Sequence, residues 1–315
     1  MPEVPAAAMA GHASRAELAQ SLTMILFHDL VQRVPSAKAY IDDVSARGER
    51  VVFDHGAVRT VLWPAGGLPA GERALTRVLA PLGYVLREVY PLAKLRMTGR
   101  SWCHADAPES IAQFFVSELH PERFSQAFED TVTRVLASSR DPLVAADLED
   151  LATLAERHAL PIERARRLLP ALVKCFDRHH DLFALSDYEF LRAESPEMAW
   201  IATEGNAFNH ATDRVADVEA VAREQKERQR PIKDTIEISR SGRVRQTAFK
   251  AVQVERVFLD SGREVRRIVP GSFYEFISRD PLPDATELDL AFDAGNATGI
   301  FAMTASRTTA DVFTT

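Results

Sequence analysis

The sequence is poor in cysteine and contains no long apolar run, and both shortages exclude whole classes of protein. Two cysteines, Cys103 and Cys175, in 315 residues cannot build a disulfide scaffold or a cysteine-rich zinc site. They suit a reducing compartment, so we expect a cytoplasmic protein. No window approaches the ~20 consecutive apolar residues that span a bilayer, and the first residues lack a charged segment followed by an apolar one, the pattern of a secretory leader. We therefore expect no membrane partner.

An excess of basic charge is also absent. The chain has 38 Lys and Arg against 45 Asp and Glu, a formal net charge of −7, whereas nucleic-acid binding leaves a basic face. Gly66-Gly67 stands alone, without G-x-G-x-x-G or G-K-[ST], so no phosphate-binding glycine loop is predicted. A G-x-S-x-G nucleophile elbow is missing too. A chain of this length buries an ample core without metal, so a metal site would serve function.

The pattern of elements changes along the chain and predicts one integrated α+β domain in five segments. Strand-like stretches rich in β-branched and aromatic residues alternate with a long helix-periodic region. The predicted segments are N-terminal helices over 1–49, a first βαβββ unit over 50–119, a helical insertion over 120–199, a second βαβββ unit over 200–285 and a C-terminal tail over 286–315. Residues 298–306 in the tail are expected to add a strand.

Strands and turns inside the two units follow from residue type. In the first unit we expect strands over 50–63, 84–97 and 111–119, with Pro91 marking a bulge or a sheet edge. In the second unit we expect a strand near 207–215 and three more over 232–239, 245–260 and 264–280. Ser241-Gly242 and Ser261-Gly262 predict the hairpin turns between these last three.

An internal repeat connects the two units. Phe53-Asp-His55-Gly-Ala-Val-Arg59 aligns with Phe208-Asn-His210-Ala-Thr-Asp-Arg214, and both copies lie on the first strand of their unit. Repetition of a supersecondary unit indicates a fold built from paired copies. If the two first strands lie side by side, the two histidines face one another across a shared cup.

Two imidazoles and one carboxylate on one face make a metal site that keeps open positions for substrate and O₂. Glu275, in Gly-Ser-Phe-Tyr-Glu275-Phe on the last strand, is the candidate carboxylate, because an acid inside an aromatic strand is costly to bury unless it is paired or metal-bound. A single strand histidine is more often a hydrogen-bonded core residue, and Glu275 alone could face solvent. The repeat is what favours the metal interpretation.

Five stretches distributed over the chain form a recognisable combination: FDHGAVRTV, FFVSEL, NHAT with the Trp200 segment upstream, RQTAF and PGSFYEF. Together they resemble the DUF1338 family, whose characterised activity is 2-oxoadipate dioxygenase/decarboxylase, or hydroxyglutarate synthase. The resemblance runs from about Leu26 to Arg279. The resemblance implies a vicinal-oxygen-chelate, glyoxalase-like fold in which paired βαβββ units form a metal-binding cup. It also implies an enzyme that converts a 2-oxo acid and O₂ to a shortened 2-hydroxy acid and CO₂.

The family's site residues map onto this chain one by one. Its Fe(II) ligands fall on His55, His210 and Glu275, and its carboxylate-binding arginine falls on Arg59, four residues after the first histidine. We therefore expect Fe²⁺ as the cofactor and Arg59 as the catalytic residue, with Arg59, His55 and His210 bordering the substrate. A guanidinium suits this role because it binds carboxylate through two parallel hydrogen bonds.

Alternatives stay open at this point. One is a redox-silent isomerase or lyase of glyoxalase type, and another is a non-catalytic small-molecule binding protein, which gains weight if the three ligands fail to meet. Members known as 2-oxoadipate enzymes are longer than this chain, so the exact 2-oxo acid is undecided, as is the oligomeric state.

Three further polar residues have two interpretations each, and four others have one. Glu118 is either a fourth ligand or histidine partner, or a structural carboxylate. Arg245 and Gln246 either line the pocket or form a solvated strand edge. Asp213 and Arg214 are expected to pair at the pocket mouth, and Cys175 with His179 shares a helix face without further ligands nearby.

Overall fold

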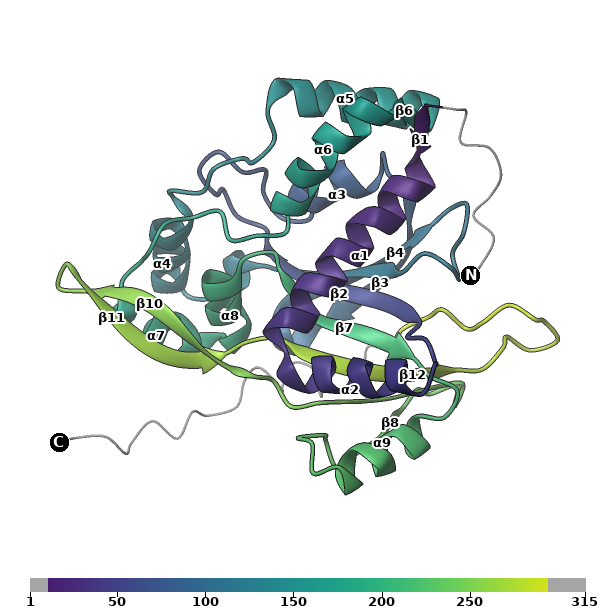
Figure 1. The fold of residues 1–315 in the computed structure, drawn as a ribbon. Helices are drawn as coiled ribbons and strands as arrows, with labels where there is room; N and C mark the ends of the chain where they lie inside the picture. Colours follow the sequence, from purple (N-terminus) through teal and green to yellow (C-terminus); the bar gives the residue numbers. More distant parts are fainter. Residues whose placement is uncertain (1–10, 294–315) are drawn as a thin grey trace.

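The computed structural model describes residues 11–293, and its centre is one curved sheet of eight strands (Figure 1). In spatial order the strands are β3 (Tyr84–Leu92), β4 (Met97–His104), β5 (Gln113–Leu119), β2 (Phe53–Val61), β7 (Phe208–Arg214), β12 (Phe273–Arg279), β9 (Val244–Ala248) and β8 (Glu237–Ile238). The first strands of the two units, β2 and β7, pair antiparallel at the centre. Each unit closes with a last strand parallel to its first, β5 beside β2 and β12 beside β7. The predicted α+β class with paired βαβββ units is confirmed.

The first unit contains one strand more than predicted. The stretch 84–97 is divided into the edge strand β3 and the short 3-10 helix Ala93–Leu95, after which Arg96 takes a left-handed conformation with φ of 55°. Pro91 lies on an edge strand, as expected, because the missing N–H then weakens no central ladder. The strand β4 was not predicted, since its sequence MTGRSWCH has few β-branched residues and an internal glycine.

In the second unit, two predicted strands are each divided. Residues 245–260 form β9 and then β10 (Gln253–Asp260), while 264–280 form β11 (Arg263–Pro270) and then β12. β10 and β11 form a separate two-stranded sheet, a hairpin that projects from the main sheet (Figure 1). Its turn is the predicted Ser261-Gly262, with φ of 49° and 77°, as a two-residue hairpin turn requires. Pro270-Gly271 ends β11 and redirects the chain into the sheet.

Helices pack around the sheet and form the predicted insertion. The insertion holds five helices where three were predicted: α4 (Gln126–Leu136), α5 (Ala145–Arg157), α6 (Ile162–Lys174), α7 (Leu185–Glu194) and α8 (Pro196–Glu204). The remaining helices are α1 (Arg15–Arg33), α2 (Pro35–Ala46), α3 (Arg73–Leu79) and α9 (Val218–Glu227). α1 begins at a capping box in which Ser14 and Glu17 satisfy each other's backbone N–H. Pro35 occupies the first turn of α2.

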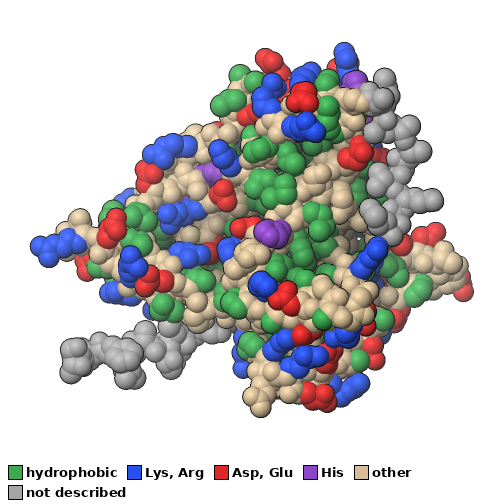
Figure 2. Space-filling view, in the orientation of Figure 1, with side chains coloured by type: hydrophobic (Ala, Val, Ile, Leu, Met, Phe, Trp, Pro, Cys, Tyr) green, Lys and Arg blue, Asp and Glu red, His purple; other side chains and the backbone are tan. Residues whose placement is uncertain are grey.

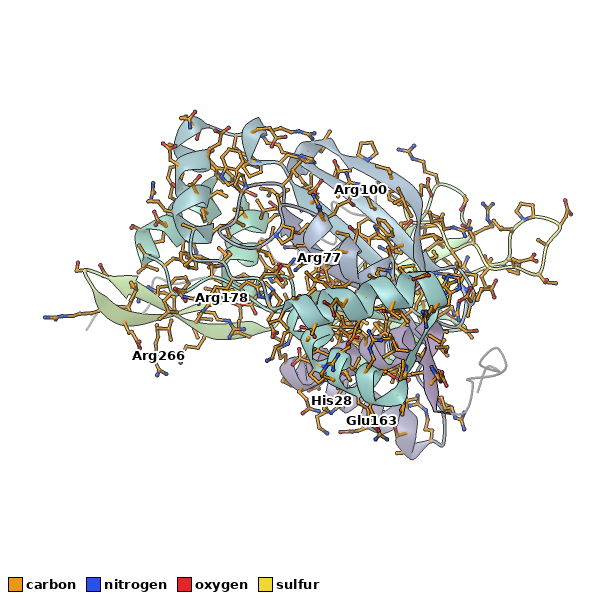
Figure 3. All side chains as sticks on the ribbon, turned by 90° about the horizontal axis from the view of Figure 1, so that it is seen from above. His28, Arg77, Arg100, Glu163, Arg178 and Arg266 are labelled. Atoms are coloured by element: carbon orange, nitrogen blue, oxygen red, sulfur yellow. The ribbon has the colours of Figure 1, made fainter. Side chains whose placement is uncertain are left out.

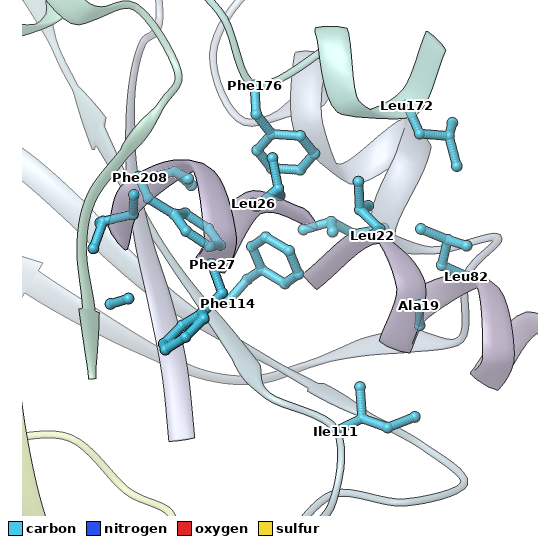
Figure 4. Packing of buried hydrophobic residues seen from close by; sticks show 14 of the residues in the cluster. Ala19, Leu22, Leu26, Phe27, Leu82, Ile111, Phe114, Leu172, Phe176 and Phe208 are labelled. Atoms are coloured by element: carbon cyan, nitrogen blue, oxygen red, sulfur yellow. The ribbon is translucent and has the colours of Figure 1, made fainter. Parts of the chain in front are cut away.

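The main core lies between the sheet and α1, with α6 on the far side of that helix (Figure 4). Alternation along each strand separates this core from the inside of the cup. On β5, Phe114 packs outward with Phe176 and Phe208, whereas Phe115 packs inward against Tyr90. A second core joins the insertion to the β10–β11 hairpin, where Trp200 Nε1 donates to Gly271 O at 3.1 Å.

Charged side chains of both signs are interspersed on the face shown in Figure 2, and apolar side chains also reach that surface. Met24 and Ile25 of α1 are exposed. Figure 3 shows Arg266 at the rim of the molecule on the β10–β11 hairpin, where it pairs with Glu255 at 2.7 Å. Within residues 11–293, no helix is long and apolar enough to cross a membrane. The tail prediction, including a strand over 298–306, falls mostly outside the described residues. The five-segment division stays a prediction.

Candidate metal centre

His55, His210 and Glu275 converge inside the cup. One ligand atom from each lies within 4.8 Å of the other two, and the Nε2 atoms of both histidines are 3.5 Å from Glu275 Oε2. The two imidazole rings lie edge to face with centroids 5.5 Å apart. The sequence prediction that the two first strands place their histidines opposite one another is confirmed in this geometry.

Strand register explains the convergence. His55 pairs with Thr212 across the β2–β7 junction, and Thr212 in turn pairs with Glu275 on β12. The Thr212 hydroxyl donates to Glu275 Oε2 at 2.7 Å and lies 3.1 Å from His55 Nε2. One row across three neighbouring strands therefore carries a candidate ligand at each end and, between them, a hydroxyl that contacts both.

A buried ion pair lies directly behind His55. Asp54 Oδ1 is 2.8 Å from His55 Nδ1, and Arg279 donates to both Asp54 oxygens at 2.9–3.1 Å. The side chains of Arg279 and Asp54 are 0% and 1% exposed, so the pair is dry. Burial of charge at this depth is tolerated because the two groups neutralise each other and fill their hydrogen-bonding capacity.

The electrostatics of the ligands follow from this burial. Burial lowers the pKa of His55, but hydrogen bonds to Asp54 and Glu275 outweigh it and raise that pKa above the usual value. At His210, burial prevails and lowers the pKa to about 3. Burial raises the pKa of Glu275, yet the neighbouring histidines and Thr212 hold it below its ordinary value. The centre thus offers an ionised carboxylate and a neutral imidazole, the forms that bind metal.

Arg59 lies on β2, two positions beyond Ala57 and four beyond His55, and it is fully buried. Its guanidinium carbon is 5.0 Å from the centroid of the Trp200 ring. Burial lowers the pKa of Arg59 to about 10, opposed by the charge of Glu197. The Arg59 charge in turn contributes to lowering the pKa of His210, so it acts within the same cup as the ligands.

Aromatic side chains line the first-unit side of the cup. Ala57, Tyr90, Phe115 and Phe292 form one apolar cluster. The Phe292 ring is 4.8 Å from both His55 and Phe115, and its backbone N–H donates to the Tyr90 hydroxyl at 3.0 Å. This wall excludes water from one side of the ligands.

The donor set fits a transition metal. Two imidazole nitrogens and one carboxylate oxygen suit Fe(II) and its neighbours in the first row, and three protein ligands leave positions for other molecules. In the part of the chain that the structure describes, these three residues are the only such group of histidine, cysteine and acidic side chains. Their roles as ligands remain predictions.

Glu118 does not hold the place in the first unit that Glu275 holds in the second. Glu275 pairs with Thr212, which lies two positions after His210. The equivalent position in the first unit, two after His55, is Ala57, and its partner on β5 is Phe115. Glu118 instead pairs with Arg100 at 3.1 Å and accepts from the Glu72 backbone at 2.7 Å. The structural interpretation of Glu118 is therefore the correct one.

Other polar candidates also have partners outside the centre. Arg245 pairs with Asp280 at 2.8 Å, and Gln246 donates to Glu237 on the neighbouring edge strand at 3.1 Å. The expected pairing of Asp213 with Arg214 is wrong, because Asp213 accepts from the Tyr40 hydroxyl and the Val52 backbone.

Sequence reasoning missed several residues around the centre. They are Asp54, Glu197, Trp200, Thr212, Arg279 and Phe292. Asp54 stands inside the repeat that revealed the histidines, so the motif itself carried a signal for it. The helix α8 residues and Phe292 come from segments distant in sequence, and only the tertiary structure brings them to the cup.

Paired βαβββ units that enclose two histidines and a glutamate define a protein of the vicinal-oxygen-chelate class with a candidate metal centre. A sequence model of the 2-oxoadipate dioxygenase/decarboxylase family matches residues 14–288. The chain belongs to this family.

Relatives of known sequence or structure agree with this fold. The chain is 23% identical over 309 residues to the chloroplastic/amyloplastic 2-oxoadipate dioxygenase/decarboxylase of Oryza sativa subsp. japonica, covering 88% of this chain and 76% of that protein. A crystal structure from Ralstonia eutropha JMP134, assigned to the glyoxalase superfamily, superposes with a TM-score of 0.89 at 55% identity, covering 94% of this chain and 91% of that one.

Enzymes crystallised with a substrate share the fold at lower identity. The hydroxyglutarate synthase of Oryza sativa in complex with 2-oxoadipate gives a TM-score of 0.71 at 19% identity, covering 96% of this chain and 98% of that one. The corresponding complex from Pseudomonas putida gives 0.68 at 20% identity, covering 93% and 74%. These two show the common fold.

Proposed function

We propose that the chain is an Fe(II)-dependent dioxygenase that decarboxylates a 2-oxo acid and yields the 2-hydroxy acid one carbon shorter. The observation that carries the proposal is the convergence of His55, His210 and Glu275 beside a buried arginine, in a chain of the 2-oxoadipate dioxygenase/decarboxylase family. Two relatives crystallised with 2-oxoadipate support a 2-oxo acid as the substrate class.

The reaction balances without an external reductant. The bond between C1 and C2 of the 2-oxo acid breaks and releases CO₂, and one C–H bond at C3 becomes C–OH. Both oxygen atoms of O₂ enter the products, and O₂ accepts the four electrons that the two oxidations release. Iron, when bound, supplies the activation of O₂ that a protein side chain cannot provide.

The chain's own residues bind, orient and dry the reactants. Arg59 would bind a substrate carboxylate through its planar fork, and desolvation around it strengthens that attraction. Glu197 and Trp200 hold the guanidinium in place, the first by charge and the second by its ring face. Phe115 and Phe292 form the apolar wall that excludes water from the reacting carbon atoms.

O₂ uptake by Fe(II)-loaded protein tests the proposal. We expect O₂ consumption and CO₂ release in equal amounts with at least one member of a panel of 2-oxo acids that pairs each dicarboxylate with the monocarboxylate of the same length. The matched control is Glu275→Gln, which keeps the side-chain volume and removes the anionic ligand. If no panel member stimulates O₂ uptake above this control, the proposal is wrong.

A redox-silent isomerase or lyase is the second candidate. It is favoured by the 55% identity to a protein assigned to the glyoxalase superfamily, and it would use a metal only to polarise the substrate. Such an enzyme would turn over anaerobically with Zn²⁺ or Mn²⁺, so the same panel without O₂ separates the two. The third alternative, a non-catalytic binding protein, loses its main support because the three ligand residues meet.

A further inference from the structure

Asp54 owes its position to an irregularity in β2. Opposite β7, Phe53 pairs with Asp213 and His55 pairs with Thr212, so Asp54 is an extra residue without a partner on β7. Neighbouring side chains of a regular strand point to opposite faces. A bulge changes this and re-aims a side chain, and here the Asp54 carboxylate reaches His55 Nδ1 at 2.8 Å.

Arg279 fixes the Asp54 carboxylate. Its Nε and Nη2 donate to Asp54, while its Nη1 donates to the carbonyls of Asp289 at 2.7 Å and Ala291 at 2.9 Å. The guanidinium plane is thereby held on both sides. Because the ion pair is buried, neither side chain can turn toward water without leaving a charge unpaired.

We propose that Asp54 and Arg279 are positioning residues that keep the proton of His55 on Nδ1, so that the Nε2 lone pair faces the metal. An ionised carboxylate only accepts hydrogen bonds, so the Nδ1 atom beside Asp54 at 2.8 Å carries a proton. A bound metal would take the place of the contacts that Nε2 makes with Thr212 at 3.1 Å and Glu275 at 3.5 Å. Such a partner fixes the ring's tautomer and orientation and raises its basicity as a ligand. This inference rests on the proposed metal centre and concerns how this chain prepares it.

The second unit provides an internal contrast. A matching irregularity occurs on β7, where Ala57 pairs with His210 and Val58 pairs with Phe208, leaving Asn209 as the extra residue. Among residues 11–293, neither Asn209 Oδ1 nor His210 Nδ1 has a hydrogen-bond partner. The two bulges are equivalent in sequence and position, yet only the one at Asp54 bonds to its histidine.

Nitrogen NMR of ¹⁵N-histidine-labelled, metal-free protein tests the proposal without any turnover. The His55 signals, assigned by their loss in His55→Gln, should show a protonated Nδ1 in the parent. Asp54→Asn should shift the proton toward Nε2, because the neutral amide accepts from Nδ1 more weakly than the carboxylate does, while Nε2 still faces the Glu275 carboxylate at 3.5 Å. Asn209→Ala should leave the His55 signals unchanged. An unprotonated Nδ1 in the parent would overturn the proposal before any variant is made.

Metal titration gives the second measurement. The dissociation constant for Co²⁺ should be about 10–100-fold higher in Asp54→Asn than in the parent. In Asn209→Ala it should stay within about threefold of the parent value. Arg279→Lys should lie between, because the charge remains and the fork is lost. Equal Co²⁺ affinity in the parent and Asp54→Asn overturns this inference alone. A parent that binds neither Co²⁺ nor Fe²⁺ instead overturns the proposed function, while the NMR result still decides the position of the proton.

Discussion

The two βαβββ units have the same topology but contribute unequally to the cup. A pseudo-twofold axis between β2 and β7 relates two rows of paired residues that run across the four central strands. One row is Glu275, Thr212, His55 and Gln113, and its counterpart is Phe115, Ala57, His210 and Phe273. The histidines correspond to each other, whereas the glutamate of the second unit corresponds to a phenylalanine of the first.

This difference gives the cup two sides with different tasks. The second unit supplies two of the three candidate ligands. The first unit supplies the third, Arg59 and most of the apolar wall, which Phe292 of the tail completes. A symmetric pair of glutamates would fill a fourth position around a metal, whereas Phe115 leaves that position to another molecule. Under the proposed function, this asymmetry leaves one coordination position of the metal to the substrate.

Removal of a ligand is the change with the largest expected effect. His55→Ala, His210→Ala and Glu275→Ala should each abolish Fe²⁺ binding, since a site with two protein ligands holds the ion poorly. The folded state should survive, because the chain buries its core without metal. Iron content after anaerobic loading and desalting measures the effect, with circular dichroism as the control for folding. Parent-like iron in all three variants would disprove the assignment.

Arg59 tests the task assigned to the first unit. A charged hydrogen bond is worth roughly 1.5–3 kcal/mol, so Arg59→Ala should reduce kcat/KM about 10- to 150-fold on whichever 2-oxo acid is active. Arg59→Lys keeps the charge and loses the fork, so its defect should be smaller but present. Both variants should retain iron. Normal turnover by Arg59→Ala, or a defect fully explained by lost iron, would show that Arg59 is not the substrate anchor.

The asymmetry itself can be removed by substitution. Phe115→Glu places a carboxylate where the second unit has Glu275, so metal should bind more tightly while O₂ uptake is lost as the open position is filled. Phe115→Gln is the matched control, since it has the same shape without the charge and should not tighten metal binding. Co²⁺ titration and O₂ uptake are measured on both. Undiminished O₂ uptake by the glutamate variant would place the substrate elsewhere.

Much of this arrangement was predictable from the sequence, and the limits have physical causes. The two histidines were found because they recur in a motif on the first strand of each unit, and Glu275 because it is an acid inside an aromatic strand. Both signals lie in the local sequence. β4 was missed because its burial depends on neighbouring strands rather than on its own composition. The roles of Glu197, Trp200 and Phe292 depend on where α8 and the segment after β12 pack, and that packing has no local signature. Asp54 is part of the repeated motif, but its hydrogen bond to His55 depends on a β-bulge, and no residue type in the sequence predicts that bulge.

Backbone packing at the centre of the sheet differs between the units as well. Gly56 pairs with Ala211 across β2 and β7, and a Cβ atom at Gly56 would lie 2.2 Å from the Phe208 ring. Gly56→Ala should therefore cost about 1–3 kcal/mol of unfolding free energy, whereas Ala211→Gly should cost less, about 0.5–1 kcal/mol. Urea unfolding measures both. A smaller loss for Gly56→Ala than for Ala211→Gly would show that Phe208 moves aside freely.

The smallest expected effect concerns two buried carboxylates, one in each unit. Arg279 and His55 overcome the effect of burial and hold the pKa of Asp54 well below its usual range. Asp213 lacks such a partner, and burial raises its pKa to about 7 although Tyr40 and Val52 donate to it. Between about pH 4, where an unfolded aspartate titrates, and pH 7, folded Asp213 keeps a proton that the unfolded chain has released. Its contribution to stability therefore falls as the pH rises through this window.

Asp213→Asn removes that titration and tests its sign. We compare urea-unfolding free energies of the parent and the variant at both ends of the window, so that all other titrating groups cancel. The parent should lose about 1 kcal/mol or more relative to the variant on going from low to neutral pH. The asparagine itself costs stability at either pH, because its amide N–H₂ faces one of the two donors that the carboxylate accepts from, so only the change with pH carries the test. The contrary result is a difference in unfolding free energy between parent and variant that stays constant with pH or changes in the opposite direction. It would mean that Asp213 is already ionised in the folded protein, like Asp54 in the first unit.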